Sequence, residues 1–210
     1  MSEELDPSEL GTQEYWDTAY RLEVKNFRHH GDVGEIWFGE DIAERITDWV
    51  NKNIPKTNQI LDVGCGNGML LVQLSRMGFT NLNGVDYSND AVVLAKDVSK
   101  HYGTDITFAM ANILNTVGTE DFEVILDKGT YDAISMSTNA KEDREAYISN
   151  VHKALKTNGL LIITSCNWTK DELISHFHTR FNVFDVILTP QFKFGGNIGS
   201  VFSSVIFQKK

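Results

Sequence analysis

The chain has 210 residues, of which 41% are hydrophobic, and a formal net charge of −10. This length and composition suit one compact domain with a sizeable core, and the sequence has no run of about 18 apolar residues that would span a membrane. The acidic balance argues against a general nucleic-acid binder, which normally presents a basic face, and is compatible with a basic protein partner.

The N-terminus and the cysteines bear on the compartment. The stretch MSEELDPSEL is acidic and polar, unlike a signal or transit peptide. The two cysteines, Cys65 and Cys166, imply no disulfide framework. We therefore expect a cytoplasmic or nuclear protein, and a monomer.

From about residue 58 the sequence alternates between strand-like and helix-like segments. Strands are expected at 58–64, 81–87, 106–112, 122–129 and 160–167. Helices are expected at 68–77, 88–103, 141–159 and 170–179. Thr169 and Glu172 form a capping-box pattern for the last helix. Two more strands, 181–190 and 200–208, are expected to form an antiparallel hairpin joined by a Gly-rich loop.

This alternation predicts an α/β fold. We expect a doubly wound, mostly parallel, Rossmann-like sheet of seven strands with helices on both faces and a C-terminal antiparallel hairpin. Residues 1–57 carry two expected helices, at about 12–29 and 40–52, and are assigned to an N-terminal helical lid over the domain 58–210. Ligands of such sheets bind at the carboxyl ends of the strands.

The stretch LDVGCGNGML, residues 61–70, ends the first expected strand with glycines at 64, 66 and 68. The spacing G-x-G-x-G differs from the dinucleotide pattern G-x-G-x-x-G, because Met69 occupies the third position. A carboxylate at Asp62 does not help to bind pyrophosphate, but it suits a cationic ligand. S-adenosylmethionine carries an ammonium and a sulfonium and has no phosphate, so it is the expected cofactor.

The sequence VDY at 85–87 supports this cofactor. Asp86 ends the second expected strand, where an acidic side chain can accept hydrogen bonds from both ribose hydroxyls. Tyr87 can then pack beside the adenine. The alternative is that Asp86 only caps the helix expected at 88–103.

The run DVGCGNG followed by GVDYS resembles the class I methyltransferase signature. Five further stretches resemble the elongation factor 1-alpha lysine methyltransferases of the methyltransferase-like protein 10 type. They are EYWDTAY (14–20), GEIWFGE (34–40), LDKGTYDAIS (126–135), ITSCNWTKDEL (163–173) and FGG (194–196). This resemblance spans nearly the whole chain, and it implies methyl transfer to a lysine of the elongation factor.

The resemblance and the motifs together give the expected cofactor contacts. These are Trp37, Asp62, Gly64, Cys65, Gly66, Asp86, Tyr87, Asn112, Ile113 and Asp127. The position of Asn112 is often acidic in such enzymes, but its amide oxygen can still accept a hydrogen bond from the adenine amine.

For the target lysine we expect four residues: Asp127, Tyr131, Asn167 and Trp168. Asp127 is expected to hold the amine, because the fourth strand should end beside the first. The alternative is that Asp127 caps the loop 128–131 and Tyr131 packs under it. Trp37 and Phe38 are expected to close the site from the lid.

Other side chains are given structural roles. Trp16 and Tyr20, spaced i and i+4, are expected to be packing residues of the first helix. The histidine pairs at 29–30 and 176–178 show no metal pattern, so no metal is expected.

Three other functions compete with protein-lysine methylation. A nucleic-acid amino-methyltransferase would carry a Pro-Pro loop after the fourth strand, and the only prolines are Pro7, Pro55 and Pro190. A small-molecule methyltransferase and a non-catalytic S-adenosylmethionine-binding module both stay open as alternatives.

Overall fold

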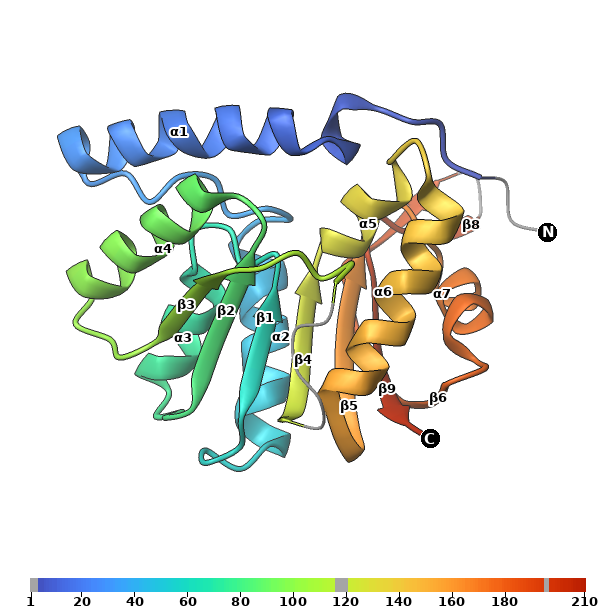
Figure 1. Ribbon diagram of the computed structural model, residues 1–210. Helices are drawn as coiled ribbons and strands as arrows, with labels where there is room; N and C mark the ends of the chain where they lie inside the picture. The colour runs from blue at the N-terminus through green and yellow to red at the C-terminus, as the bar shows by residue number, and fades with distance from the viewer. Residues whose placement is uncertain (1–3, 116–120, 195–196) are drawn as a thin grey trace.

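The computed structural model describes residues 4–115, 121–194 and 197–210, and for 191–199 only the backbone. The described chain forms a seven-stranded sheet of order β3-β2-β1-β4-β5-β9-β6 (Figure 1). The strands are β1 (Ile60–Val63), β2 (Leu82–Asp86), β3 (Thr107–Met110), β4 (Phe122–Lys128), β5 (Leu155–Ser165), β6 (Phe181–Ile187) and β9 (Ser203–Lys209). Strands β1 to β5 are parallel, and β9 pairs antiparallel with both β5 and β6. The expected sheet and its antiparallel C-terminal pair are confirmed.

Helices cover both faces of the sheet. One layer consists of α2 (Glu40–Asn53), α3 (Met69–Arg76) and α4 (Asn89–His101). The other consists of α5 (Thr130–Ser135), α6 (Ala140–Ala154) and α7 (Lys170–Phe177). Side chains alternate along the strands, so that Val124 and Leu126 pack toward the first layer and Ile125 packs toward the second. No helix in the described ranges has the length and apolar character needed to cross a bilayer.

Helix α1 (Gln13–His30) packs on α4 through Tyr20 and Val24. In Figure 1 it lies across the top of the molecule, above the carboxyl ends of the strands. Helix α2, by contrast, shares its core with the sheet through Ile42 and Ile46. The N-terminal segment therefore contributes both to the sheet packing and to the region above the strand ends.

Two expected elements differ in the structure. The helix expected to run to residue 159 ends at Ala154, because Leu155 is buried and pairs with Phe122 as the first residue of β5. The loop expected between the last strands contains a two-stranded ribbon of β7 (Gln191–Phe194) and β8 (Asn197–Ser200). The glycines at 195–196, part of the FGG motif, lie outside the described residues.

The short helix α5 was not expected, and Asp127 holds its first turn. One carboxylate oxygen accepts from the Thr130 N–H at 3.0 Å, and the other accepts from the Tyr131 N–H at 3.1 Å and the Tyr147 hydroxyl at 2.6 Å. The side chain is buried, and burial raises its pKa to about 7 although these hydrogen bonds act in the opposite direction. This arrangement is the capping alternative considered for Asp127.

The raised pKa of Asp127 predicts how stability depends on pH. Between the ordinary aspartate pKa of about 3.9 and about 7, the folded chain holds a proton at this site that the unfolded chain has released. Stability from this group is therefore lost as pH rises. From pH 6 to pH 8 the free energy of unfolding should fall by about 1 kcal/mol more in the wild type than in Asp127→Asn.

Urea unfolding of both proteins at pH 6, 7 and 8 measures this difference. Titrating groups that do not interact with Asp127 are common to both chains and cancel. Asp127→Asn also lowers the raised pKa of Asp62, which widens the expected difference. Parallel pH profiles for the two proteins would contradict the assignment.

Candidate active site

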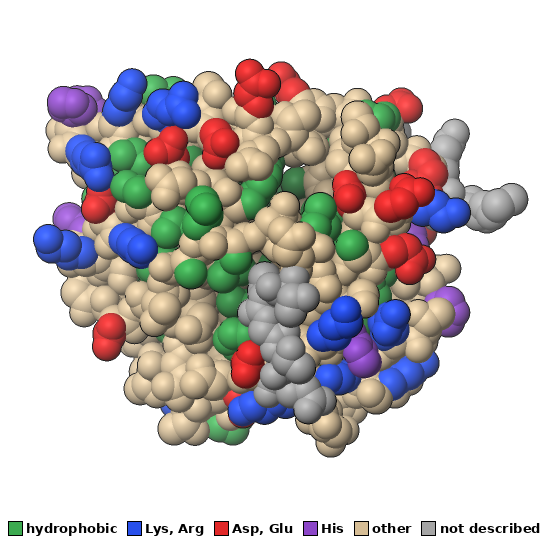
Figure 2. Space-filling model, in the orientation of Figure 1, with side chains coloured by type: hydrophobic (Ala, Val, Ile, Leu, Met, Phe, Trp, Pro, Cys, Tyr) green, Lys and Arg blue, Asp and Glu red, His purple; other side chains and the backbone are tan. Residues whose placement is uncertain are grey.

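A cavity of about 250 Å³ lies at the carboxyl ends of β1, β2 and β4 and at the loop after β5. Space-filling atoms in Figure 2 show a hollow between the α1 side and the α5–α6 side of the molecule, with acidic side chains on both flanks. The expected site residues that line this cavity are Trp37, Gly64, Asp86, Tyr87, Asn112, Ile113 and Asn167. Residues far apart in sequence thus meet where the fold class places a ligand.

The glycine loop fits against the elements around it. Gly64 and Gly66 have φ angles of 65° and 52°, in the left-handed region that favours glycine. A β-carbon on Gly64 would collide with the Thr130 hydroxyl, and one on Gly66 would lie 2.6 Å from the Tyr20 hydroxyl. The bare backbone therefore lets both α1 and α5 approach the loop.

Asp86 is fixed at the end of β2. Its carboxylate accepts from the Gly66 N–H at 3.1 Å and from the Ser88 N–H at 2.9 Å. An ionised carboxylate can accept about four hydrogen bonds, so acceptor positions remain for a ligand in the cavity. Burial raises the pKa of Asp86 to about 6, and the Ser88 and Gly66 hydrogen bonds oppose this rise.

Two expected walls of the lysine channel lie in the core instead. Tyr131 is fully buried, and its hydroxyl pairs with His176 Nδ1 at 3.0 Å. Trp168 is buried, and its indole N–H donates to Ser135 Oγ at 3.0 Å. Both rings pack in the core cluster of α6 and α7, Tyr131 from α5 and Trp168 from the loop after β5.

Asp62 and Cys65, expected to contact the cofactor at the end of the first strand, do not line the main cavity. Asp62 and Cys65 line a smaller cavity of about 20 Å³ beside the glycine loop. Cys65 is buried and Cys166 is exposed, and both are free thiols. In the described ranges no three Asp, Glu, His or Cys side chains come together as a metal-binding group.

Lys128, for which no role was expected, lines both cavities. Its ammonium donates to the Trp37 carbonyl at 2.9 Å and lies 5.7 Å from the centre of the Phe38 ring. Burial lowers its pKa, and Asp62 and Asp127 oppose that change. Lys128 therefore connects the end of β4 to the loop that carries Trp37 and Phe38.

Four carboxylates are buried at this end of the sheet: Asp62, Asp86, Asp127 and Asp132. Lys128 interacts electrostatically with Asp62 and Asp127. Burial raises the pKa of all four carboxylates, and repulsion between neighbouring carboxylates adds to the rise for Asp62 and Asp127. Lys128 lowers the pKa of Asp62. The region therefore has an excess of buried acids, which favours ligands that carry positive charge.

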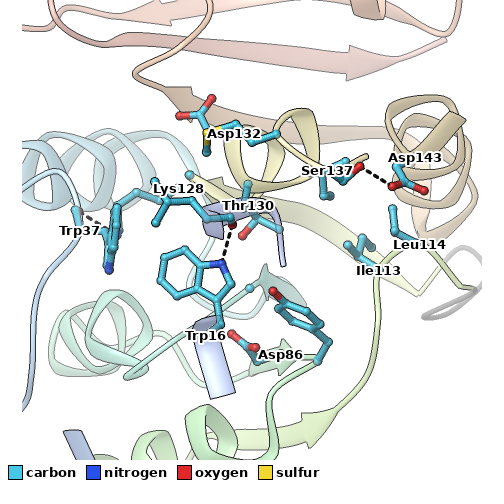
Figure 3. A pocket seen from close by; sticks show the side chains of 18 of the residues that line it. Trp16, Trp37, Asp86, Ile113, Leu114, Lys128, Thr130, Asp132, Ser137 and Asp143 are labelled. Atoms are coloured by element: carbon cyan, nitrogen blue, oxygen red, sulfur yellow. Dashed lines mark hydrogen bonds between the residues drawn. The ribbon is translucent and has the colours of Figure 1, made fainter. Parts of the chain in front are cut away.

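Trp16 and Tyr20, expected to be packing residues of α1, line the cavity. The Trp16 ring lies 5.9 Å from that of Tyr20 and 4.9 Å from that of Trp37, and its indole N–H donates to the Leu10 carbonyl at 2.8 Å. Figure 3 shows Trp16 between Trp37 and Asp86. The i, i+4 pair faces the cavity because α1 crosses the strand ends.

Residues 4–12, here called the strap, complete the cavity wall. The Ser8 N–H donates to the Met136 carbonyl at 3.1 Å, and the Glu4 carboxylate pairs with Arg144 at 2.7 Å. Leu10 and Gly11 line the cavity. The strap thus extends from α1 to the α5–α6 side.

The side-chain oxygen of Asn112, expected to accept a hydrogen bond from the adenine amine, already accepts one within the protein. The donor is the Leu114 N–H at 2.9 Å, and this hydrogen bond shapes the turn after β3. Ile113 beside it is buried and offers an apolar surface. Tyr87 faces the same part of the cavity, and its hydroxyl donates to the Thr12 carbonyl at 3.4 Å.

Gly11 provides a test of the strap. A β-carbon there would collide with the backbone carbonyl of Met136. Gly11→Ala should therefore displace the strap from α5 while the chain still folds, and cofactor affinity should fall about tenfold, or about 1.4 kcal/mol. Calorimetry of S-adenosylhomocysteine binding measures this, with the exposed Ser8→Ala as control. Equal affinity in both variants would show that the strap does not shape the site.

The similarity to known proteins covers almost the entire chain. A family model described as a methyltransferase domain matches residues 54–197. The human protein EEF1A lysine methyltransferase 2 is 42% identical over 97% of this chain and 88% of its own length. Protein-lysine N-methyltransferase efm4 of Schizosaccharomyces pombe is 39% identical over 97% of this chain and 95% of its own length.

Solved structures share the fold at low identity. The N-methyltransferase NodS from Bradyrhizobium japonicum, in complex with S-adenosyl-L-homocysteine, aligns with a TM-score of 0.67 at 15% identity. The alignment covers 92% of this chain and 98% of that one. The full-length relatives and the matching methyltransferase domain show the family. The chain belongs to the family of EEF1A lysine methyltransferase 2 and its fungal counterparts, within the class I methyltransferases.

Proposed function

We propose that this protein transfers methyl groups from S-adenosylmethionine to a lysine of translation elongation factor 1-alpha, in the cytoplasm. The observation that carries the proposal is the full-length similarity to relatives named for this activity. The cavity adds independent support, because its buried carboxylates suit a cationic cofactor and a cationic acceptor. The net charge of −10 also suits a basic protein substrate.

The residues around the cavity fit S-adenosylmethionine. Asp86 would accept from the ribose hydroxyls, because its carboxylate is fixed by two N–H groups and faces the cavity. Gly64 would contact the cofactor through its backbone at the end of β1, and Tyr87 and Ile113 would border the adenine. Asp62 would act from the cavity beside the loop, through the field of its carboxylate.

The cofactor supplies an electrophilic methyl group on its sulfonium. The protein would position the acceptor, which can supply up to about 7–11 kcal/mol of barrier lowering in favourable cases. Trp16, Trp37 and Phe38 would exclude water above the reacting atoms. Lys128 would hold that aromatic cover by its hydrogen bond to the Trp37 carbonyl.

A small-molecule methyltransferase is a second candidate, favoured by the cover over the cavity. The strap and the loop carrying Trp37 both close over it, and a long protein substrate would need an opening between them. The two candidates differ in the product that becomes labelled.

The cofactor assignment predicts a large effect at Asp86. Asp86→Ala removes a charged acceptor, and the cofactor should bind more weakly by roughly 2–3 kcal/mol, the scale of hydrogen bonds to charged groups. The control is Asp90→Ala on α4, a partly exposed acid paired with Arg21 at 3.4 Å. Calorimetry on folded variants measures both affinities. An Asp86→Ala protein that binds as tightly as Asp90→Ala would remove the basis for the ribose contact.

The substrate is tested with purified elongation factor 1-alpha and cofactor labelled in the methyl group. Mass spectrometry of the digested factor should find the label on a lysine, and replacement of that lysine by arginine should abolish labelling. Label found only in small molecules of a cell extract would favour the second candidate and contradict the proposed substrate.

A further inference from the structure

The part of the cavity above β4 and β5 contains a buried acid that the cofactor does not need. Asp132, in α5, lines the cavity, and 3% of its surface is exposed. One carboxylate oxygen accepts from the Ser165 hydroxyl, and the other accepts from the Cys166 N–H at 2.8 Å. Across the described ranges no Lys, Arg or His forms an ion pair with it.

A buried carboxylate held by two neutral donors lacks a compensating charge. Such groups are costly unless a cation or further hydrogen bonds complete their surroundings. The hydrogen bonds from Ser165 and the Cys166 N–H occupy one position on each carboxylate oxygen of Asp132, and the other groups that lower its pKa, the Cys166 thiol and the Asn167 N–H, are also neutral. A cationic group that enters this part of the cavity would complete the site.

Two other buried acids, Asp127 and Asp86, are less suited to bind this cationic group. Asp127 is satisfied by Thr130, Tyr131 and Tyr147, and it does not line the main cavity. Asp86 lies at the end of β2, on the cofactor side. Figure 3 shows Asp86 and Asp132 on opposite sides of Lys128 and Thr130.

The strand order explains this division. Strand β4 lies between β1 and β5, so the glycine loop of β1 and Asp86 of β2 occupy one side of the cavity. Asp132, Cys166 and Asn167 occupy the other side, beside β5. A cofactor held on the first side leaves the second side for the acceptor.

We propose that Asp132 binds the ε-amine of the target lysine, orients it and accepts its proton. The inference rests on the proposed function and replaces Asp127 by Asp132 as the amine-binding carboxylate. The ammonium gives one proton to Asp132, which passes it to solvent. The nitrogen lone pair then forms the new N–C bond, and the electron pair of the broken C–S bond remains on sulfur.

The surroundings of Asp132 support proton acceptance. Burial raises its pKa above the ordinary value, while the hydrogen bonds from Ser165 and Cys166 lower it. A carboxylate with a raised pKa is a better proton acceptor for an amine at neutral pH. The titratable groups that face it are Asp127 on β4 and the Cys166 thiol on the loop after β5.

Ser165 offers a matched control, because Asp132 also orders the loop after β5. The Ser165 hydroxyl accepts from the N–H groups of Asn167 at 3.1 Å and Trp168 at 2.9 Å, and it donates to Asp132. Ser165→Ala removes this loop network but keeps the carboxylate. Asp132→Asn keeps the shape of the side chain but removes its charge.

The experiment compares wild type, Asp132→Asn and Ser165→Ala with purified elongation factor 1-alpha. For Asp132→Asn we expect kcat/KM at pH 7 to fall about 100-fold, the scale for a positioned acid–base group. Cofactor affinity by calorimetry should stay within threefold. Binding of the elongation factor to the enzyme–S-adenosylhomocysteine complex should weaken more than it does in Ser165→Ala.

The pH profile separates proton acceptance from loop order. The Asp132→Asn defect should shrink to below tenfold at about pH 9.5, where much more of the lysine, with its ordinary pKa of about 10.4, is already neutral. Equal losses in Asp132→Asn and Ser165→Ala at every pH would overturn the proposal. A wild-type rate in Asp132→Asn would also overturn it.

Two further outcomes remain interpretable. If Asp132→Asn does not fold, Asp132→Glu replaces it in the experiment, because it keeps the charge but moves the carboxylate. For Asp132→Glu, kcat/KM should fall at least tenfold at unchanged cofactor affinity. A wild-type rate in Asp132→Glu would overturn the proposal. If the wild type itself fails to methylate elongation factor 1-alpha, the proposed substrate is wrong, and that result is seen before any variant is made.

Discussion

The site depends on one electrostatic constraint: four carboxylates are buried at the carboxyl ends of neighbouring strands and in the helix after β4. Asp62, Asp86, Asp127 and Asp132 are each less than 5% exposed, and Lys128 interacts with Asp62 and Asp127. Their pKa values are raised, so ionising all of them without a cationic partner is unfavourable. A cofactor with a sulfonium and a protein substrate with an ammonium would both relieve this cost. The same acids would thus favour positively charged ligands and determine where they bind.

The surrounding structure holds these acids in different roles. Asp127 is used internally, since its three donors form the turn that starts α5 and so bring Asp132 to the cavity. Asp86 is held by backbone N–H groups of the glycine loop and of α4. Above them, Lys128 connects β4 to the loop with Trp37, and the strap connects α1 to Arg144. The N-terminal segment that covers the site is therefore held both at β4, through Lys128, and at α6, through Arg144.

Local patterns predicted the parts of the site that are contiguous in sequence. Gly64 and Asp86 line the cavity as expected, because a strand end and a tight turn leave a short, specific signature. Tyr131 faces the core because the rotation of the six-residue helix α5, which has no readable period in the sequence, decides which of its side chains face the cavity. Trp168 faces the core because its backbone N–H and indole N–H donate to Ser165 and Ser135, contacts that no local pattern predicts. The roles of Trp16 and Lys128 depend on where α1 and the loop at 31–39 lie over the sheet, and such tertiary placement leaves no local signal.

The most direct test of the electrostatic constraint is proton release on cofactor binding. At pH 6.5 the cofactor's own ammonium, with an α-amino pKa of about 7.7–8.0, already carries its proton, so any released proton comes from the protein. Calorimetry of S-adenosylmethionine binding in two buffers of different ionisation enthalpy should show release of about half a proton or more, because the cation favours the ionised form of the buried acids. Identical binding heats in both buffers would mean that the acids are not titrated by the ligand, and would contradict the account.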